Sequence, residues 1–244
     1  MARTLRTAFE SPEAKRQYVR RLFATIADRY DLITVVLSYG RDRAWKQRLI
    51  REAALIPGRR VLDLACGTGD LALAAARRGA TVTGLDVTHR MLELARAKAS
   101  QAAGSGRAPR FVTGDMMALP FPSASFDRVT TGYGLRNVPD LDGALAEIAR
   151  VLAPGGMLLS LDFNRPASAA VRGAYLGYLT VVGSLLGWLL HGDADTYRYI
   201  PASIQRYPGA DGVARRLEDS GFRDVRIAGL LGGLMSLHVA TRRR

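Results

Sequence analysis

The sequence predicts an α/β protein in which a largely parallel sheet is covered by helices on both faces. Between residues 57 and 163, short apolar stretches alternate with segments of helical periodicity. This alternation is typical of βαβ units, where a helix returns the chain to the start of the next parallel strand. Gly67 and Gly69 join the first expected strand, residues 60–65, to the first sheet-covering helix, residues 71–78.

Two helices are expected before the sheet begins. Ser11-Pro12-Glu13 combines an N-cap, a first-turn proline and a first-turn acid, and helical periodicity follows over residues 12–30. A second helix is expected at residues 41–55, ended by Pro57-Gly58. Further strands are expected at residues 81–85, 110–112, 127–131 and 157–163, with helices at 89–100 and 141–152. A helix at residues 210–220 and strands near 224–228 and 234–241 complete the fold.

The alternation of strands and helices predicts two parts. Residues 1–56 form a helical cover, and residues 57–244 form the sheet domain, with a helical insertion at residues 164–208 before the last two strands. The insertion holds the most apolar segment, Ala174–Leu190, which at 17 residues lies at the lower edge of a membrane span. Its three glycines and its globular flanks favour instead a buried or interface-lying helix that lines an apolar cavity.

The amino-acid composition limits the classes of binding partner and the cellular compartment that are expected. Hydrophobic residues make up 48% of the 244, which is enough for a sizeable core. Cys66 is the single cysteine, so an intrachain disulfide is excluded and a reducing cytoplasm is expected. The net charge of +13 favours an anionic partner such as nucleic acid, anionic lipid or a small anion. Charges at Arg3, Arg6 and Glu10 argue against a signal peptide, although this prediction falls partly outside the residues that the structure describes.

Acidic residues follow or lie within three successive expected strands and predict a nucleoside site. Asp86 ends the second strand, where a carboxylate accepts hydrogen bonds from both ribose hydroxyls, and Asp115 ends the third, where it accepts from an adenine amino group. A helix cap for Asp86 and a turn role for Asp115 are the alternatives. Asp70 would place a negative charge near a pyrophosphate, whereas an acid such as Asp63 suits the ammonium and sulfonium of S-adenosylmethionine, so this cofactor fits better than a dinucleotide. The expected cofactor-binding residues are Asp63, Gly67, Thr68, Gly69, Asp86, Val87, Asp115, Met116 and Gly132.

Several motifs resemble known families. Residues 63–69 have the D-x-A-x-G-T-G form of the first motif of Rossmann-like class I methyltransferases, and residues 126–127 and 152–156 resemble later motifs of that superfamily. Gly-Leu-Arg-Asn-Val at residues 134–138 and Asp-Ala-Asp-Thr-Tyr-Arg-Tyr-Ile at 193–200 are more specific. With residues 27–31, Leu37-Ser38 and Trp45, they resemble the ubiquinone/menaquinone biosynthesis C-methyltransferase family from residue 12 to the C-terminus. The chain departs from the family pattern at Ile33, Thr34, Asp42 and Cys66, which concerns substrate specificity more than the cofactor.

The resemblance implies methyl transfer from S-adenosylmethionine to a ring carbon of a polyprenylated quinol, most simply demethylmenaquinol. Arg136 is then expected to stabilise the quinol oxyanion and Asn137 to orient the ring or a water. The structural alternatives are an ion pair of Arg136 with Asp193 or Asp195, and a turn cap for Asn137. Substrate contacts are expected from Tyr30, Tyr197, Tyr199 and Ser203.

Other interpretations stay open. The natural ring is a naphthoquinol or a benzoquinol, and a different lipid-like substrate is the nearest rival. The positive net charge is also compatible with an RNA methyltransferase, but the basic residues are dispersed and no RNA-binding module is recognisable. An NAD-dependent oxidoreductase and a nonenzymatic lipid-binding protein are weaker alternatives. The three histidines lack metal-ligand spacing, so no metal is expected. We expect a cytoplasmic protein in peripheral contact with anionic membrane, with a homodimer compatible with the sequence.

Overall fold

A seven-stranded sheet organises the molecule in the computed structural model, which describes residues 5, 7–102 and 107–244. The strands are β1 (Arg60–Leu64), β2 (Thr81–Asp86), β3 (Arg110–Thr113), β4 (Phe126–Gly132), β5 (Leu152–Phe163), β6 (Phe222–Leu230) and β7 (Met235–Arg242). Their order is β3-β2-β1-β4-β5-β7-β6, and β7 runs antiparallel to both of its neighbours. The order reverses beside β1, so the carboxyl ends of β1 and β4 flank the crevice where ligands bind in such sheets.

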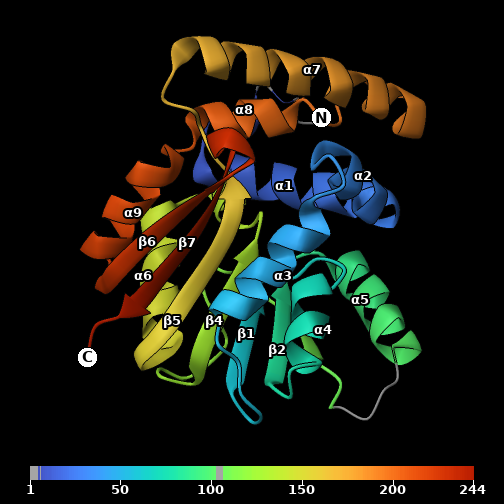
Figure 1. Cartoon of the computed structure of the whole chain (residues 1–244). Helices are drawn as coiled ribbons and strands as arrows, with labels where there is room; N and C mark the ends of the chain where they lie inside the picture. Colours follow the sequence, from blue (N-terminus) through green and yellow to red (C-terminus); the bar gives the residue numbers. More distant parts are fainter. Residues whose placement is uncertain (1–4, 6, 103–106) are drawn as a thin grey trace.

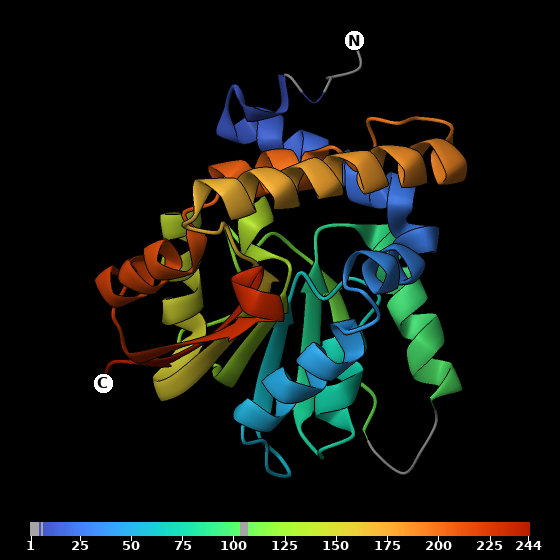
Figure 2. The same ribbon diagram turned by 45° about the horizontal axis from the view of Figure 1, so that its top comes forward.

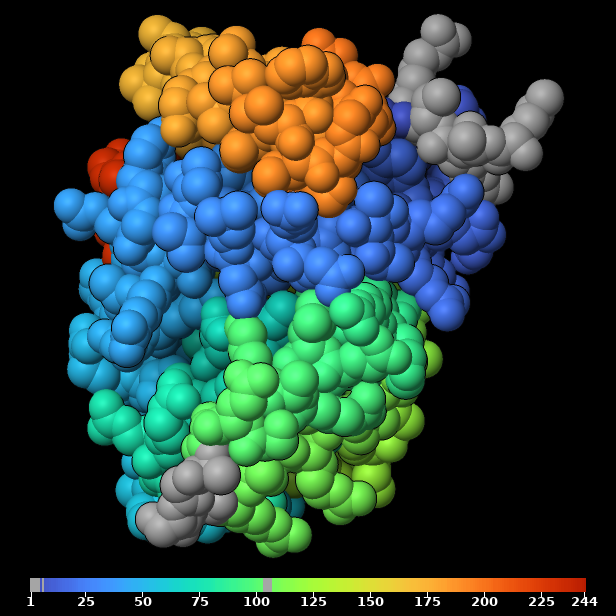
Figure 3. Space-filling model, turned by 90° about the vertical axis from the view of Figure 1, so that its right-hand side faces the viewer, coloured from blue at the N-terminus to red at the C-terminus, as the bar shows by residue number. Residues whose placement is uncertain are grey.

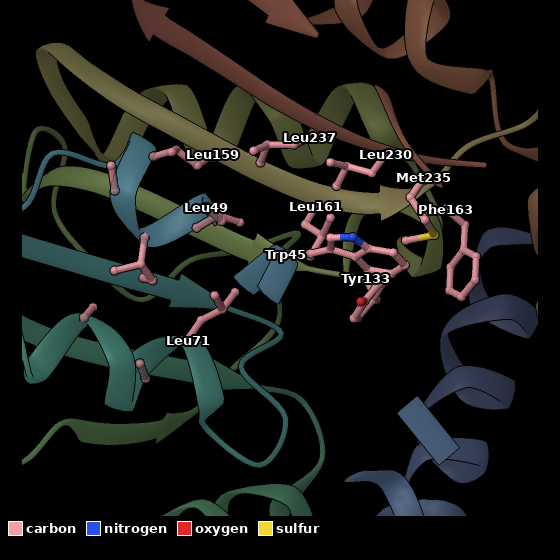
Figure 4. Close-up of a cluster of buried hydrophobic side chains, with 14 of the residues drawn as sticks. Trp45, Leu49, Leu71, Tyr133, Leu159, Leu161, Phe163, Leu230, Met235 and Leu237 are labelled. Atoms are coloured by element: carbon pink, nitrogen blue, oxygen red, sulfur yellow. The ribbon is translucent and has the colours of Figure 1, made fainter. Parts of the chain in front are cut away.

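Helices cover both faces of this sheet, as the alternation predicts (Figure 1). On one face lie α3 (Asp42–Glu52) and α4 (Asp70–Ala76), and on the other lie α6 (Leu141–Val151) and α9 (Gly209–Asp219). Helix α5 (His89–Gln101) packs beside β2 and β3. Neighbouring residues of β1 point to opposite faces, so Val61 joins one core cluster and Leu62 the other. Figure 4 shows the first of these clusters where it meets the C-terminal end of β5.

A helical cap lies over the carboxyl ends of the parallel strands. It consists of α1 (Pro12–Ile26), α2 (Tyr30–Leu37), α7 (Ala169–His191) and α8 (Tyr199–Arg206). The first two come from the N-terminal segment and the last two from the insertion, yet they lie together (Figures 1 and 2). Figure 3 shows α7, in orange, stacked on the blue N-terminal helices, with the green α5 region below them. The expected helical insertion is therefore present as α7 and α8.

Three expected boundaries are wrong. The helix expected at 12–30 ends at Ile26, and a 3₁₀ turn at Ala27–Arg29 redirects the chain into α2, which the sequence did not predict. Strand β5 begins at Leu152 rather than at residue 157. Phe126 of β4 pairs with Leu152 and Arg128 pairs with Met157, so the register shifts between them and the strand extends back across Pro154-Gly155-Gly156. Strand β6 spans Phe222–Leu230 and is longer than expected, since pairing with β7 extends it.

Among the described helices, α7 alone is long and apolar enough to cross a membrane by length and composition. Only 22% of its most apolar window is buried within the structure.

Candidate functional site

The turn after β1 is braced by Asp86. Gly67 and Gly69 have φ of +52° and +86°, a left-handed conformation that favours glycine. The Gly67 amide donates to Asp86 Oδ2 at 2.9 Å, and the Thr88 amide donates to Oδ1 at 2.8 Å. Burial raises the pKa of Asp86, while these amide hydrogen bonds oppose that shift. Asp86 thus holds the loops after β1 and β2 together, and each oxygen keeps a lone pair for a ligand.

Asp63 carries a buried carboxylate oxygen without a partner. Its Oδ1 accepts from Thr130 Oγ1 at 2.7 Å, but its Oδ2 has no hydrogen bond among the described residues. Burial raises the pKa of Asp63 to about 7. A buried polar atom left unpaired is costly, so this oxygen marks a place for a cationic hydrogen-bond donor.

Two adjoining clefts surround these carboxylates. A polar cleft is lined by Asp63, Gly67 and Thr68 together with Lys46 and Asp70. A larger cleft, with about 740 Å³ of empty space partly open to solvent, adjoins it. Its walls include Gly67, Asp86, Val87, Asp115, Met116 and Gly132.

The expected cofactor residues therefore gather in one region, with Gly69 set apart. A Cβ on Gly69 would lie 3.1 Å from Ala95 and 3.2 Å from Phe111, so this glycine permits close packing of the turn. Asp115 Oδ1 accepts from the Met117 amide, and Oδ2 forms a 3.2 Å ion pair with Arg16 of α1. The N-terminal cover thus reaches the rim of the larger cleft.

Lysines that the sequence analysis overlooked connect this cover to the cofactor loop. Lys46 Nζ lies 2.7 Å from Asp42 and 2.9 Å from Asp70, and these carboxylates raise the lysine's pKa against the effect of burial. Lys98 bridges Asp31 of α2 at 2.6 Å and Asp70 at 3.0 Å.

A composition signal could have found these lysines. The chain has only three lysines among its 35 basic residues. The third, Lys15, donates from α1 to the backbone carbonyls of Arg136 and Val138, and burial lowers its pKa to about 8. All three lysines therefore form contacts between the N-terminal helices and the rest of the site, in a chain whose other basic residues are arginines.

A third cavity is apolar and lies beneath the helical cap. It has about 600 Å³ of empty space, and its walls come from α1, α2, α8 and the ends of β4 and β5. Trp45, Tyr133, Phe163 and Met235, which Figure 4 shows close together, line one side of it. Tyr30 and Tyr133 both line this cavity and the two clefts, so these two rings lie where the three spaces meet.

Arg136 is the charged group that faces the apolar cavity. It lies in the 3₁₀ turn Leu135–Asn137 and is 5% exposed. Its Nε lies 3.2 Å from Asp162 Oδ1, and its amide donates to Asp162 Oδ2 at 3.1 Å. The alternative role of Arg136 in an ion pair with a carboxylate is therefore confirmed, but Asp162 is the partner; Asp193 and Asp195 are exposed, and Asp195 pairs with Arg198. Asp162 is the last residue but one of β5, beside the turn, and burial raises its pKa.

The expected substrate residues occupy different positions. Tyr197 and Tyr199 line the apolar cavity; the Tyr197 hydroxyl contacts His191 Nε2 at 2.7 Å, and the buried Tyr199 hydroxyl has no partner among the described residues. Ser203 lies outside that lining and accepts from Arg136 Nη1 at 2.7 Å. Asn137 lines the larger cleft, and its Nδ2 donates to the Tyr133 carbonyl, as a turn cap does.

The histidines have ordinary neighbours. His89 lies near Glu93, and His238 contacts the Ala210 carbonyl. Within residues 7–102 and 107–244, no group of three or more His, Cys, Asp or Glu side chains could hold a metal ion.

Comparison with known proteins identifies the family. Residues 11–242 match the model of the ubiE/COQ5 methyltransferase family. The chain belongs to this family. A demethylmenaquinone methyltransferase of Thermus thermophilus is 41% identical over 223 residues, covering 91% of this chain and 100% of the relative. The Deinococcus radiodurans enzyme of the same name is 41% identical over 231 residues, covering 94% of each chain.

Solved structures support the fold class. A SAM-dependent methyltransferase from Thermotoga maritima, described as a possible histamine N-methyltransferase, superposes with a TM-score of 0.66 at 18% identity, covering 92% of this chain and 100% of that one. A SAM-dependent methyltransferase from Aquifex aeolicus gives a TM-score of 0.59 at 18% identity, with coverages of 80% and 88%. The expected Rossmann-like class I methyltransferase fold is confirmed, and with the family match the chain is a SAM-dependent methyltransferase.

Proposed function

We propose that this protein methylates a ring carbon of demethylmenaquinol, with S-adenosylmethionine as the methyl donor, and so produces menaquinol. The observation that carries the proposal is an apolar cavity lined by Arg136 that meets the two clefts at Tyr30 and Tyr133. An apolar ring fits the cavity, and an ionisable hydroxyl on that ring fits its buried guanidinium. The names of the relatives at 41% identity support the same substrate class.

The residues of the polar clefts fit the proposed cofactor. Asp63 Oδ2, buried and unpaired, suits an ammonium group, and Lys46 offers a cation to a carboxylate in the same cleft. Asp86 and Val87 would hold the ribose, and Asp115 and Met116 would hold the adenine in the larger cleft, which Gly132 also lines. Thr68 completes the polar cleft. S-adenosylmethionine supplies an electrophilic methyl group on a sulfonium, and no metal is needed for its transfer.

The chain's own contribution is alignment and charge. When bound, S-adenosylmethionine would supply the methyl group to the ring carbon as its sulfur–methyl bond breaks, and the methylated ring carbon would release its proton to water. Arg136 would stabilise the quinol oxyanion that makes the carbon nucleophilic; its Nη2 makes no hydrogen bond with a described residue and is left for a ligand. Positioning two reactants in a dry site contributes roughly 7–11 kcal/mol to such a reaction.

The surrounding polar groups would orient Arg136 and the ring. Asp162 and Ser203 fix two sides of the guanidinium, and Asn137 accepts from Nη1 at 3.3 Å. The unpaired Tyr199 hydroxyl is a candidate donor to a quinol oxygen, while Tyr30 and Tyr197 would contact the ring or tail. We propose a homodimer at a cytoplasmic location with peripheral membrane contact, the contact being supported by the net charge of +13.

The test is methyl transfer from labelled S-adenosylmethionine to short-tailed quinols kept reduced in the assay. The panel contains demethylmenaquinol, a methoxy-benzoquinol and an RNA control. We expect labelling of demethylmenaquinol. Labelling of the benzoquinol alone would instead assign the enzyme to ubiquinone biosynthesis. If the cofactor binds and neither quinol is labelled, the substrate assignment is overturned.

A further inference from the structure

Helix α2 presents a row of apolar side chains to solvent. They recur at helical spacing along one side of the helix. Their exposed fractions are 51% for Leu32, 50% for Val35, 38% for Val36 and 49% for Tyr39. The opposite side of α2, with Ile33 and Leu37, is buried and lines the apolar cavity. Burial of the inner side accounts for the helix, but it leaves the outer row without a partner in this chain.

Helix α7 continues the same surface. Its exposed residues are Val181 at 69%, Leu185 at 54%, Trp188 at 63% and Leu189 at 60%. Tyr178 of α7 stacks on Tyr39 beyond the end of α2, with ring centroids 5.6 Å apart, so the two exposed rows adjoin. The helix contains one arginine, one histidine and no acidic residue. We call the eight exposed residues, Leu32, Val35, Val36, Tyr39, Val181, Leu185, Trp188 and Leu189, the α2–α7 face.

Beside α2, the charges without an ion-pair partner among the described residues are all positive. Arg29 precedes α2, and Arg41 and Arg43 follow it; all three are exposed, and none forms an ion pair with a described residue. The nearby acids are neutralised, since Asp28 pairs with Arg90 and Asp31 pairs with Lys98.

The acids beyond α7 are also engaged. Asp195 pairs with Arg198, and Asp193 accepts from the Asp195 amide within its own turn. An apolar surface with free cations at its border is complementary to a lipid surface that carries anionic headgroups. We infer that the α2–α7 face docks on an anionic lipid bilayer, with Trp188 and Leu185 in the acyl boundary and the three arginines at the headgroups.

This orientation gives the cavity a route to lipid. Only α2, about 10 Å across, separates the docking face from the cavity that Arg136 lines. A substrate dissolved in the bilayer would reach Arg136 past α2 without its apolar tail crossing water; this delivery step rests on the proposed function, whereas docking does not. Large exposed apolar surfaces also serve protein contacts, so a second copy of the chain is the outcome that must be separated from lipid.

The two tryptophans make the test direct. Trp188 is 63% exposed on the face, whereas Trp45 is 6% exposed in the core. Full-length protein is mixed with vesicles of phosphatidylcholine alone or equimolar with phosphatidylglycerol, and partition is measured by sedimentation. Tryptophan emission is recorded with and without brominated lipid. We expect binding to the anionic vesicles, a blue shift, and quenching of one of the two tryptophans, lost in Trp188→Phe.

Variants locate the surface. Leu185→Asp on α7 and Val36→Asp on α2 should each weaken partition at least tenfold, because a carboxylate enters the acyl boundary. Replacing Arg29, Arg41 and Arg43 by Gln should weaken binding to anionic vesicles and leave the weak binding to phosphatidylcholine unchanged. Ile56→Asp is the matched control, since Ile56 is 54% exposed away from the face, and it should partition as the wild type does.

Three results would overturn the inference. They are wild-type protein that stays in the supernatant with every vesicle, vesicle binding without quenching of Trp188, and a dimer that Leu185→Asp dissociates while vesicles have no effect. Methylation of a water-soluble short-tailed quinol is measured in parallel. Loss of that activity with vesicle binding intact would count against the proposed function alone, and the reverse pattern would count against docking alone.

Discussion

The cofactor clefts and the apolar cavity meet at Tyr30, but they are built from different kinds of structure. The clefts are made by short turns at the ends of β1 and β2, held by backbone amides and buried carboxylates such as Asp63 and Asp86. The cavity is made by helices from both ends of the chain, held by ring contacts and apolar packing. The clefts therefore hold polar atoms in fixed positions, whereas the cavity encloses an apolar space around the Arg136 guanidinium.

This difference predicts where a change affects binding and where it affects turnover. Changes in the turns should alter cofactor affinity, and changes in the cavity should alter the reaction with the quinol.

Arg136→Ala should lower kcat by about 10²–10³-fold, the cost of removing one oxyanion donor, while the cofactor's Kd changes less than threefold. Stopped assays with the short-tailed quinol and calorimetric titration of the cofactor measure the two quantities. The variant also leaves Asp162 buried without its partner, which should lower the free energy of unfolding by about 3–5 kcal/mol.

Arg136→Lys separates these two losses, because it keeps a cation beside Asp162 and sacrifices the guanidinium geometry. It should unfold closer to the wild-type temperature and remain slow. Equal losses of turnover and cofactor affinity in Arg136→Ala, or unchanged turnover, would break the division between the two regions.

Asp63→Asn should weaken cofactor binding about 10–100-fold and leave kcat at saturating cofactor within threefold, since a buried charged acceptor is lost. The folded-state pKa of about 7 lies above the ordinary 3.8 of Asp63, so the folded protein keeps a proton that the unfolded chain releases. Its contribution to the free energy of unfolding therefore falls as pH rises from about 4 to about 7 and is constant above that.

Cofactor affinity should run in the opposite direction and rise as pH increases through 7, because the ionised carboxylate is the form that accepts from an ammonium. Titrations between pH 6 and 8 should show this rise in the wild type and a flat profile in Asp63→Asn. Asp127→Asn is the control, as Asp127 lies in an ion pair with Arg60 outside the lining of either cleft. A pH profile that persists in Asp63→Asn would assign the titration to another group.

Ile33→Met with Thr34→Asn changes two positions at which the chain departs from the family pattern. Both side chains line the apolar cavity, and Ile33 is 3% exposed. Ile33→Met nearly conserves volume, a change that costs less than about 1.5 kcal/mol, and we expect kcat/KM of the pair to change by about tenfold or less. We expect the ratio of kcat/KM for naphthoquinol over benzoquinol to shift while cofactor affinity stays within twofold; a shift in cofactor affinity alone would place these residues with the clefts.

The cofactor half was predictable because its signals are local. A glycine turn after an apolar strand and a carboxylate at the next strand end lie within about 20 residues of each other, and parallel pairing brings them together. The expected residues from Asp63 to Gly132 line the two clefts for this reason, with Gly69 as the packing residue beside them.

The substrate half depends on long-range contacts that no local pattern records. Asp162 was missed as the partner of Arg136 because the two residues lie 26 positions apart and meet only through the pairing of β4 with β5. Helix α2 was missed because Tyr30–Leu37 is apolar on both sides, and its helical period is hidden by the outer row. Lys46 and Lys98 were visible only as rare residues in an arginine-rich chain.

Tyr30 is a wall of all three cavities, and this geometry couples their ligands. A cofactor that shifts the ring changes the shape of the space left for the quinol. Thermodynamic linkage requires the effect to be reciprocal: if the cofactor tightens quinol binding by some factor, the quinol tightens cofactor binding by the same factor. After methyl transfer the donor has lost its sulfonium charge, so the two products would meet across Tyr30 and Tyr133 under a different coupling.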